Sequence, residues 1–346
     1  MIHDNENVGS PLVAYNDTEA NIEALSATEG QIAYATDTKV FGFYDGTQWA
    51  WGLRIVGSGW AMDSGGNNRG EDALDLQITR YDDTQIASGY RSFIGSGYAN
   101  KADKRYCVVV GGINNTATAT YVGGGYCTVI GGNANYAGGY YGSSVVVGGR
   151  ENRATGNKST IVGGSYNDAS GDYSFIGGGN DNTASGKYSF VPGGNQAKAD
   201  KWAQQSHSSR DFNTVGDAQT SQLVSSNLTT DNTPTELFLD GVTGGSLRAT
   251  IASDTTWAFE IIVTARRTDT DNESAGYYFL GVIDNNAGTT SLVGSVTKTV
   301  IAEDTAGWDV NVTADNANDA LIITATGENS KTIQWVAFIR LIETTG

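Results

Sequence analysis

The segments that decide the fold are SVVVGGRENRATG (144–156), STIVGGSYNDASG (159–171) and SFIGGGNDNTASG (174–186), which superpose at a spacing of 15 residues. Four further copies share this register: SFIGSGYANKADK (92–104), CVVVGGINNTATA (107–119), CTVIGGNANYAGG (127–139) and SFVPGGNQAKADK (189–201). Only the copy at 127–139 needs extra residues on both sides. A short unit repeated at a fixed period is the signature of a solenoid, so we expect seven β-solenoid turns of two short strands each.

Three positions of the repeat each carry one kind of side chain. The third position is always aliphatic and β-branched: Ile94, Val109, Val129, Val146, Ile161, Ile176 and Val191. The first position is always small: Ser92, Cys107, Cys127, Ser144, Ser159, Ser174 and Ser189. A later position is always alanine: Ala102, Ala117, Ala137, Ala154, Ala169, Ala184 and Ala199. Because equivalent positions of successive turns lie above one another, these columns predict a thin core lined by small and β-branched groups.

The bends between the strands also follow a pattern. Paired glycines such as Gly148-Gly149 and Gly163-Gly164 can take positive φ or let two backbones approach closely. Three residues after the second glycine stands an asparagine column: Asn100, Asn115, Asn135, Asn152, Asn167 and Asn182. Asparagine suits a left-handed turn or a stacked amide ladder, so we place the corners of the solenoid here.

A second strand face is apolar as well. It carries Phe93, Val108, Thr128, Val145, Thr160, Phe175 and Phe190, followed two residues later by Val110, Ile130, Val147 and Val162. Such a surface is costly to leave in water, and a thin solenoid cannot bury it alone. We therefore expect other copies of the chain to cover it in a closed homotrimer.

The unit Ser-x-x-x-Gly-Gly-x-x-Asn-x-Ala-Ser/Thr-Gly resembles the head repeats of trimeric autotransporter adhesins and of phage tail fibres that share the left-handed parallel β-roll. The resemblance spans about 110 residues. It implies a parallel homotrimer of β-rolls that serves attachment to a host-surface glycan or protein. The start MIHDNENVGS has no signal-peptide pattern and no membrane anchor is evident, which favours the phage side. We expect a virion protein that is made in the host cytoplasm and contacts other tail proteins through its N-terminal part, without membrane insertion.

The flanking sequence is also rich in strand patterns. Residues 1–52 are expected to form an attachment or collar segment with a small antiparallel β unit, and Asp45-Gly46 reads as its hairpin turn. The other expected parts are a bridge at 53–88, the repeat domain at 89–201, a neck at 202–214 and a tip or trimerisation domain at 215–346. Alternating strands in the last part predict an antiparallel β-sandwich or jelly roll. The predicted fold class is therefore all-β.

Composition excludes several kinds of partner. The net charge of −17 argues against nucleic-acid binding, which needs clustered Lys and Arg. Two cysteines and two histidines leave little for a zinc site, and no cofactor is expected. Cys107 and Cys127 share a column in consecutive turns, and we expect buried free thiols there rather than a disulfide.

Acidic residues are the candidate catalytic or metal-binding groups. Glu151, Asp168, Asp172 and Asp181 fall in solenoid bends, where acidic residues are ordinary turn chemistry, so no catalytic residue is assigned and no enzymatic activity is expected. The run Asp269, Asp271 and Glu273 could hold Ca²⁺, although a solvated loop is the favoured interpretation. A polysaccharide-degrading tailspike, a bacterial trimeric surface adhesin and a receptor-less architectural virion protein remain alternatives.

Tyrosines mark the candidate ligand contacts. Two insertions, at 120–126 and 138–142, interrupt the regular repeat, and insertions in a solenoid map to loops on one face. The tyrosines around them are Tyr121, Tyr126, Tyr136, Tyr140 and Tyr141. Aromatic faces with polar edges suit sugar rings, although tyrosine also packs well between subunits. A second candidate at the C-terminal tip consists of Tyr277, Tyr278 and Trp308.

Overall fold

The computed structural model describes residues 14–17, 32–35, 40–44, 49–56, 59–61, 68–77, 79–270 and 273–346. Every regular element within these ranges is a β-strand, which confirms the all-β prediction. No helix long and apolar enough to cross a membrane occurs among the same residues. The chain divides into two compact units, Met1–Asn152 and Arg153–Gly346.

The first unit begins with five strands. They are β1 (Ala14–Asp17), β2 (Ile32–Ala35), β3 (Val40–Tyr44), β4 (Trp49–Val56) and β5 (Gly59–Ala61). β3 pairs antiparallel with both β2 and β4, whereas β1 pairs with β2 in parallel. The turn expected at Asp45-Gly46 lies outside the described residues. β5 then pairs in parallel with the first strand of the solenoid.

Two parallel ladders build the solenoid of the first unit. One contains β6 (Leu74–Asp75), β7 (Phe93–Ile94), β9 (Val108–Val109), β11 (Thr128–Val129) and β13 (Val145–Val146). The other contains β8 (Lys101–Ala102), β10 (Thr116–Ala119) and β12 (Tyr136–Gly139). Each repeat therefore contributes one strand to each ladder, as its two-strand pattern predicts.

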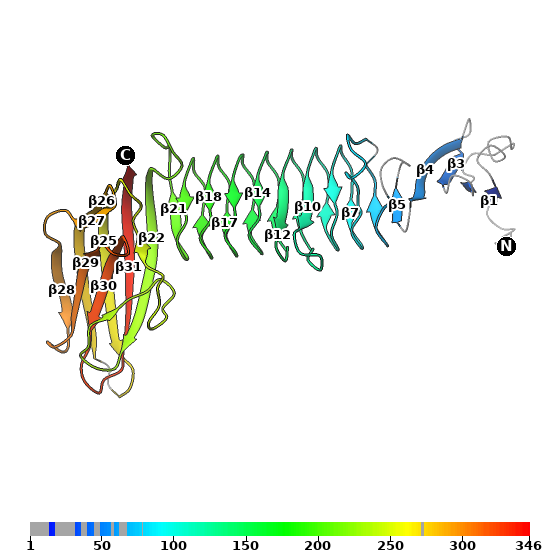
Figure 1. Cartoon of the computed structure of the whole chain (residues 1–346). Coiled ribbons are helices and arrows are strands. Elements are labelled where there is room, and N and C mark those ends of the chain that lie inside the picture. Colours follow the sequence, from blue (N-terminus) through cyan, green and yellow to red (C-terminus); the bar gives the residue numbers. More distant parts are fainter. Residues whose placement is uncertain are drawn as a thin grey trace. The chain divides into compact units, whose positions relative to one another are not determined.

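The second unit continues the same design. One ladder contains β15 (Thr160–Ile161), β17 (Phe175–Ile176), β19 (Phe190–Val191) and β21 (Gln205–His207), and the other contains β14 (Arg153–Ala154), β16 (Asp168–Ala169), β18 (Thr183–Ala184) and β20 (Lys198–Ala199). Figure 1 labels β14, β17, β18 and β21 along these coils. The β-solenoid has about nine turns, more than the seven expected, because parallel pairing extends to Leu74–Asp75 before the repeats and to Gln205 after them.

The core of each coil has the composition that the columns predict. All seven β-branched side chains of the third position and all seven alanines are fully buried. The small first position is buried too, and in Ser159 its hydroxyl donates to the Gly156 carbonyl at 2.8 Å. The coil is therefore filled by small groups that leave no room for larger ones.

Corners combine glycine with left-handed residues of other types. The second glycine of each pair takes positive φ, for example 89° at Gly149 and 83° at Gly164. Two more positions per turn do so without glycine, as at Tyr166 (60°) and Tyr173 (59°). Such conformations are uncommon for bulky residues, so the surrounding hydrogen bonds of the coil must hold them.

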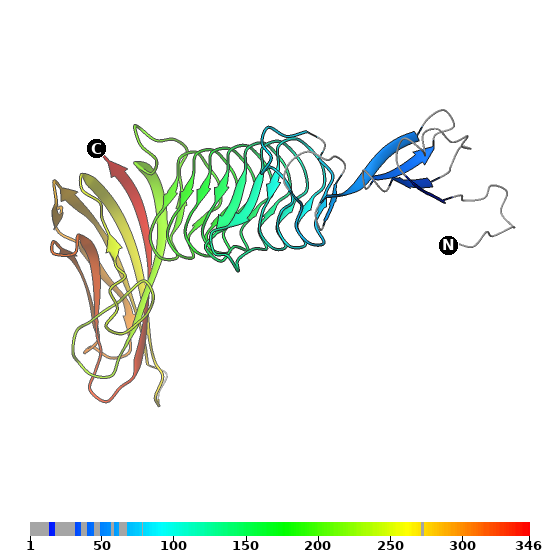
Figure 2. The same cartoon turned by 45° about the vertical axis from the view of Figure 1, so that its right-hand side comes forward.

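The C-terminal part of the second unit contains a long antiparallel sheet. Its strands are β22 (Ala218–Thr229), β31 (Ile333–Thr345), β25 (Thr255–Arg267), β26 (Ser274–Asn286), β27 (Thr289–Leu292) and β28 (Thr297–Glu303). The order β22-β31-β25-β26 follows from their registers, and β27 and β28 both pair with β26. Figure 2 shows these long strands beside the last solenoid coils, to which β22 is joined through antiparallel pairing with β21.

A smaller antiparallel sheet accompanies it. β30 (Ala320–Thr326) pairs with β29 (Asp309–Asp315) and with two short strands, β23 (Thr235–Glu236) and β24 (Ala249–Thr250). One hydrophobic cluster draws buried side chains from both sheets, including Trp257, Phe259, Phe279, Val310, Ile323 and Trp335. The alternation of buried and exposed residues along the long strands fits a sheet with one face in this core.

Candidate functional site

Three exposed tyrosines form a cluster at the two insertions of the first unit. The ring centroids of Tyr121 and Tyr140 lie 5.6 Å apart, those of Tyr121 and Tyr141 also 5.6 Å, and those of Tyr140 and Tyr141 4.8 Å. Their exposed fractions are 47%, 52% and 63%. The structure thus brings together three aromatic side chains that the sequence places in two separate segments.

The insertions extend the solenoid ladder before they leave it. β10 and β12 have four residues each, where the other strands of their ladder have two, and they remain in parallel register as far as Ala119 and Gly139. The Tyr121 N–H donates to the Tyr140 carbonyl at 2.8 Å and continues this pairing beyond the strands. Figure 1 shows the loops that follow β10 and β12 projecting beyond the regular coils. A rigid ladder therefore positions the cluster.

The other two tyrosines of this candidate lie elsewhere. Tyr136 is half-buried on β12, and its ring covers Gly138, where an added Cβ would lie 2.8 Å from a ring carbon. Tyr126 stands at a left-handed corner and stacks on Tyr106 with centroids 4.9 Å apart. Tyr136 therefore has a packing role, and Tyr126 belongs to a separate aromatic contact.

The three residues expected at the C-terminal tip also do not form one site. Tyr277 and Trp308 are buried in the core of the C-terminal sheets, where both pack against Trp335. The Tyr277 hydroxyl donates to a Glu303 carboxylate oxygen at 3.1 Å, and burial raises the pKa of Tyr277 far above its usual value. Sequence alternation could have predicted this burial, because Tyr277 and Phe279 share one face of β26.

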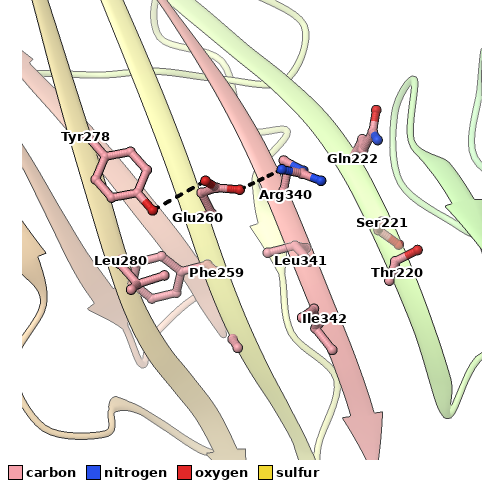
Figure 3. Close-up of a pocket in the computed structure, with 11 residues that line it drawn as sticks. Thr220, Ser221, Gln222, Phe259, Glu260, Tyr278, Leu280, Arg340, Leu341 and Ile342 are labelled. Carbon is pink, nitrogen blue, oxygen red and sulfur yellow. Dashed lines mark hydrogen bonds and ion pairs between the residues drawn. The ribbon is translucent and has the colours of Figure 1, made fainter.

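Tyr278, on the opposite face of β26, lines a surface hollow of about 390 Å³. Its hydroxyl donates to Glu260 at 3.3 Å, and Glu260 pairs with Arg340 at 2.8 Å, as Figure 3 shows. Burial and the nearby Glu260 charge raise the pKa of Tyr278. The other lining residues are Thr220, Ser221, Gln222, Ala258, Phe259, Leu280, Leu341 and Ile342. The hollow has no signal in the sequence, because its residues come from β22, β25, β26 and β31, of which only β25 and β26 are consecutive in the chain.

The acidic run proposed for Ca²⁺ lies in a network of ion pairs. Arg267 binds Asp269 at 2.6 Å and Glu273 at 3.0 Å, and Lys331 binds Glu273 at 2.9 Å. The hydrogen bond from Arg267 lowers the pKa of Asp269 to about 2, and that from Lys331 lowers the pKa of Glu273. Asp271 lies outside the described residues. In the described part of this run the carboxylates already have cationic partners, and no cluster of metal ligands is found in that part of the chain.

Three ionisable side chains of the solenoid, Asp168, Cys107 and Cys127, are shielded from solvent to different degrees. Burial raises the pKa of Asp168, an effect that the nearby Arg153 charge opposes. Cys107 and Cys127 are both buried free thiols, as the sequence analysis expected. A hydrogen bond from Cys107 lowers the pKa of the Cys127 thiol. Burial shields both sulfur atoms from solvent, so this pair does not form an open site.

No protein-family model and no curated protein matches the sequence. A structure comparison finds the tailspike protein of Acinetobacter phage vB_ApiP_P1, with 10% identity, a TM-score of 0.18, and coverage of 97% of this chain and 100% of that chain. It also finds a tailspike protein of Acinetobacter baumannii bacteriophage Fri1, with 7% identity, a TM-score of 0.21, and coverage of 80% and 59% respectively. The Acinetobacter baumannii phage AM24 tailspike protein matches with 9% identity, a TM-score of 0.20, and coverage of 87% and 59%.

TM-scores near 0.2 do not define the fold or the activity of this chain. The fold stated above therefore rests on the strand pairing of the chain itself. One expectation is nevertheless corrected: the Fri1 tailspike is described as a capsular polysaccharide depolymerase, so the structures that match this chain include an enzyme. We therefore withdraw the expectation that the chain has no enzymatic activity. The acidic residues of the bends could not have revealed an activity from sequence, because acidic residues are common in turns whether or not they are catalytic.

Proposed function

We propose that the chain is a phage tail protein that binds a glycan on the host surface through its β-solenoid. The observation that carries this proposal is the cluster of Tyr121, Tyr140 and Tyr141, which a rigid ladder holds exposed at the insertions. Exposed rings with hydroxyl edges offer both the apolar contact and the hydrogen bonds that sugars use. The repeat unit, which resembles those of attachment proteins, supports the same role.

The proposed assembly is a parallel homotrimer of left-handed β-rolls with the C-terminal sandwich or jelly roll as its tip. Its support is the second apolar face. Five side chains on this face keep between 37% and 45% of their surface exposed: Val110, Ile130, Val147, Val162 and Phe190. In the second unit, strand pairing connects this face of the solenoid with one face of the C-terminal sheet. The paired residues are, in order, Phe190, Gln205, Gln222, Arg340, Glu260 and Leu280. One neighbouring copy could therefore cover coil and sheet together.

Within this proposal the protein is made in the host cytoplasm, is carried on the virion, and contacts other tail proteins through its N-terminal part. The protein acts outside the cell after release. Its proposed ligand is a glycan, and a surface protein is the alternative ligand. A bacterial trimeric adhesin or a spacer without receptor would share the solenoid, so binding experiments must separate these roles.

A glycan array with the full-length protein tests the proposal. We expect saturable binding to a subset of bacterial surface glycans, reduced at least tenfold by Tyr140→Ala with Tyr141→Ala. Tyr81→Ala is the matched control, because Tyr81 is 73% exposed and lies outside the cluster. Release of reducing ends from each bound polysaccharide is measured in parallel, since hydrolysis would assign a depolymerase. Absence of glycan binding together with binding to surface proteins would contradict the proposal.

A further inference from the structure

A second aromatic feature lies on the solenoid of the second unit, which we call the corner ladder: Lys158, Tyr173, Lys187, Tyr188 and Trp202. The rings of Tyr173 and Tyr188 stack with centroids 5.0 Å apart and planes inclined by 23°. Trp202 meets Tyr188 edge to face, also at 5.0 Å. Both tyrosines keep 44% of their surface exposed. A continuous aromatic strip therefore follows successive turns at one corner of the coil.

Two lysines lie against this strip. The Lys158 Nζ is 5.0 Å from the centre of the Tyr173 ring and 3.4 Å from its hydroxyl oxygen. The Lys187 Nζ is 5.0 Å from the centre of Tyr188 and 5.1 Å from that of Trp202. Neither ammonium group forms a carboxylate ion pair among the described residues, unlike Lys198 and Lys201, which both bind Asp200. The corner ladder thus presents cationic charge that the described part of the chain does not neutralise.

Backbone geometry fixes the spacing of the ladder. Lys158, Tyr173 and Tyr188 occupy the same left-handed position in successive turns, with φ of 59°, 59° and 62°. The Tyr173 N–H donates to the Asn157 carbonyl and the Tyr188 N–H to the Asp172 carbonyl, each at 2.9 Å. Glycine or asparagine would fit such a position with less strain, so the backbone does not require these large side chains. Large side chains held in strained backbone conformations cluster at functional sites.

Asp172 lies beside the corner ladder, but its carboxylate forms no ion pair with Lys158 or Lys187 among the described residues. Asp172 precedes Tyr173, and its Oδ1 accepts hydrogen bonds from the backbone N–H and the side-chain amide of Asn157, each at 2.9 Å. These amide contacts orient the carboxylate toward the corner of the preceding turn. The two lysines are therefore the charged groups with donors left for an external anion.

We infer that the corner ladder binds an anionic polysaccharide, with sugar rings against the aromatic strip and acidic groups of the sugars on Lys158 and Lys187. This inference rests on the proposed glycan-binding function and names the chemical class of glycan. The lysines stand about two strand spacings apart, roughly 10 Å, so a polymer with a repeating acidic sugar can engage both. Nucleic acid fits less well, because the net charge of −17 repels a densely charged polyphosphate.

The test measures binding of the full-length protein to purified capsular polysaccharides, some built from uronic or sialic acids and some neutral. We expect the wild-type protein to prefer acidic polymers, with affinity that falls as salt rises. Lys158→Gln with Lys187→Gln should reduce that affinity at least tenfold and weaken its salt dependence. Arg210→Gln with Arg266→Gln removes the same charge from exposed positions elsewhere in the unit, and should leave affinity unchanged.

Each outcome separates the inference from the proposed function. If glycans bind but the lysine variant binds as tightly as wild type, or only neutral polymers bind, the inference is overturned while the proposed function stands. If no glycan binds at all, both fail. Single-stranded DNA serves as competitor, and displacement of the polysaccharide by DNA at equal charge concentration would also overturn the inference. Unchanged melting temperatures for all variants establish that folding is intact.

Discussion

At the scale of single residues, the asparagine column stabilises the coil through hydrogen bonds. Asn167 is buried, and its Nδ2 donates to the carbonyls of Gly163 at 3.0 Å and Gly179 at 3.1 Å. Its Oδ1 accepts from the backbone N–H and the Nδ2 of Asn182, both at 3.0 Å. One side chain thus satisfies backbone groups of its own turn and of the next, which aspartate could not do because it lacks the amide donor.

Asn167→Ala should therefore destabilise the protein by about 2 to 4 kcal/mol, because each buried polar group left without a partner costs roughly 1 to 3 kcal/mol. Denaturant unfolding of the second unit in the intact chain measures the change. Asn180→Ala is the control, since Asn180 is exposed and its side-chain amide donates to Asn195 Oδ1 at the surface at 3.0 Å. Equal effects of the two substitutions would show that the amide ladder is not what holds the turns.

A titratable residue gives a second prediction at this scale. Glu343 is buried, its carboxylate accepts from Gln219 at 3.3 Å, and burial raises its pKa above the usual value. A raised folded-state pKa contributes stability below the unfolded-state pKa and loses that contribution as pH rises through the folded-state pKa. Glu343→Gln should therefore raise the melting temperature relative to wild type at pH 7.5.

The comparison across pH is the sharper part of this prediction. The difference in melting temperature between Glu343→Gln and wild type should shrink towards pH 4, where the wild-type carboxyl is protonated. Glu151→Gln is the control, because Glu151 is an exposed corner residue of a surface ion pair. If Glu343→Gln were less stable than wild type at pH 7.5 and equally stable at pH 4, the ionised carboxylate would stabilise the fold, which contradicts the prediction.

At the scale of elements, close backbone contact between coils explains a glycine column. An added Cβ at Gly171 would lie 2.2 Å from the Gly186 carbonyl oxygen of the next turn, whereas one at Gly163 would meet nothing within 4 Å. Neither glycine has positive φ, so the two positions differ in space rather than in backbone conformation. Of two glycines in the same turn, only Gly171 is required by the packing of the coils.

Gly171→Ala should therefore cost about 1 to 3 kcal/mol, the range for overpacking, because rigid backbone must shift. Gly163→Ala should change stability by well under 1 kcal/mol, and could add a little through loss of unfolded-state freedom. Thermal unfolding of the two variants under the same conditions compares them directly. Greater destabilisation by Gly163→Ala would contradict the packing described here.

The repeating elements were predictable because every turn imposes the same steric demand on the same column. The non-repeating features were not. Alternation along β26 places the adjacent Tyr277 and Tyr278 on opposite faces, but it does not reveal the hollow that Tyr278 lines, which forms only where β22, β25, β26 and β31 pair. Likewise, only three of the five insertion tyrosines meet, because the pairing between Tyr121 and Tyr140 decides which rings approach. The corner ladder could not be predicted from sequence, because Tyr and Lys do not favour the left-handed backbone conformation that aligns them.

At the scale of the whole molecule, the outer face exposes apolar side chains that one copy of the chain does not bury. Val162 and Phe190 of the solenoid are partly exposed, as are Ile262, Leu280 and Ile342 on the C-terminal sheet. The polar row of Gln205, Gln222, Arg340 and Glu260 runs between these apolar side chains, and a face with this mixed composition is typical of a protein–protein interface. We therefore expect a homotrimer in solution, with a mass near 109 kDa, three times the 36.3 kDa of the chain.

Light scattering on the full-length protein at micromolar concentration measures this mass. Ile262→Glu with Leu280→Glu should shift the mass towards that of one chain, because it places charges on the face to be covered. Val242→Glu is a control on an exposed aliphatic residue outside the long sheet. A monomer for the wild-type protein would remove the trimer from the account.

The central claim is attachment to a host glycan, and the most direct test is binding of labelled full-length protein to a broad panel of bacterial cells before and after mild periodate oxidation. Periodate destroys sugar diols and leaves most surface protein in place. The account predicts saturable binding to particular strains that is lost after oxidation and weakened by Tyr140→Ala with Tyr141→Ala. Binding that survives periodate but disappears after protease treatment of the cells would contradict it.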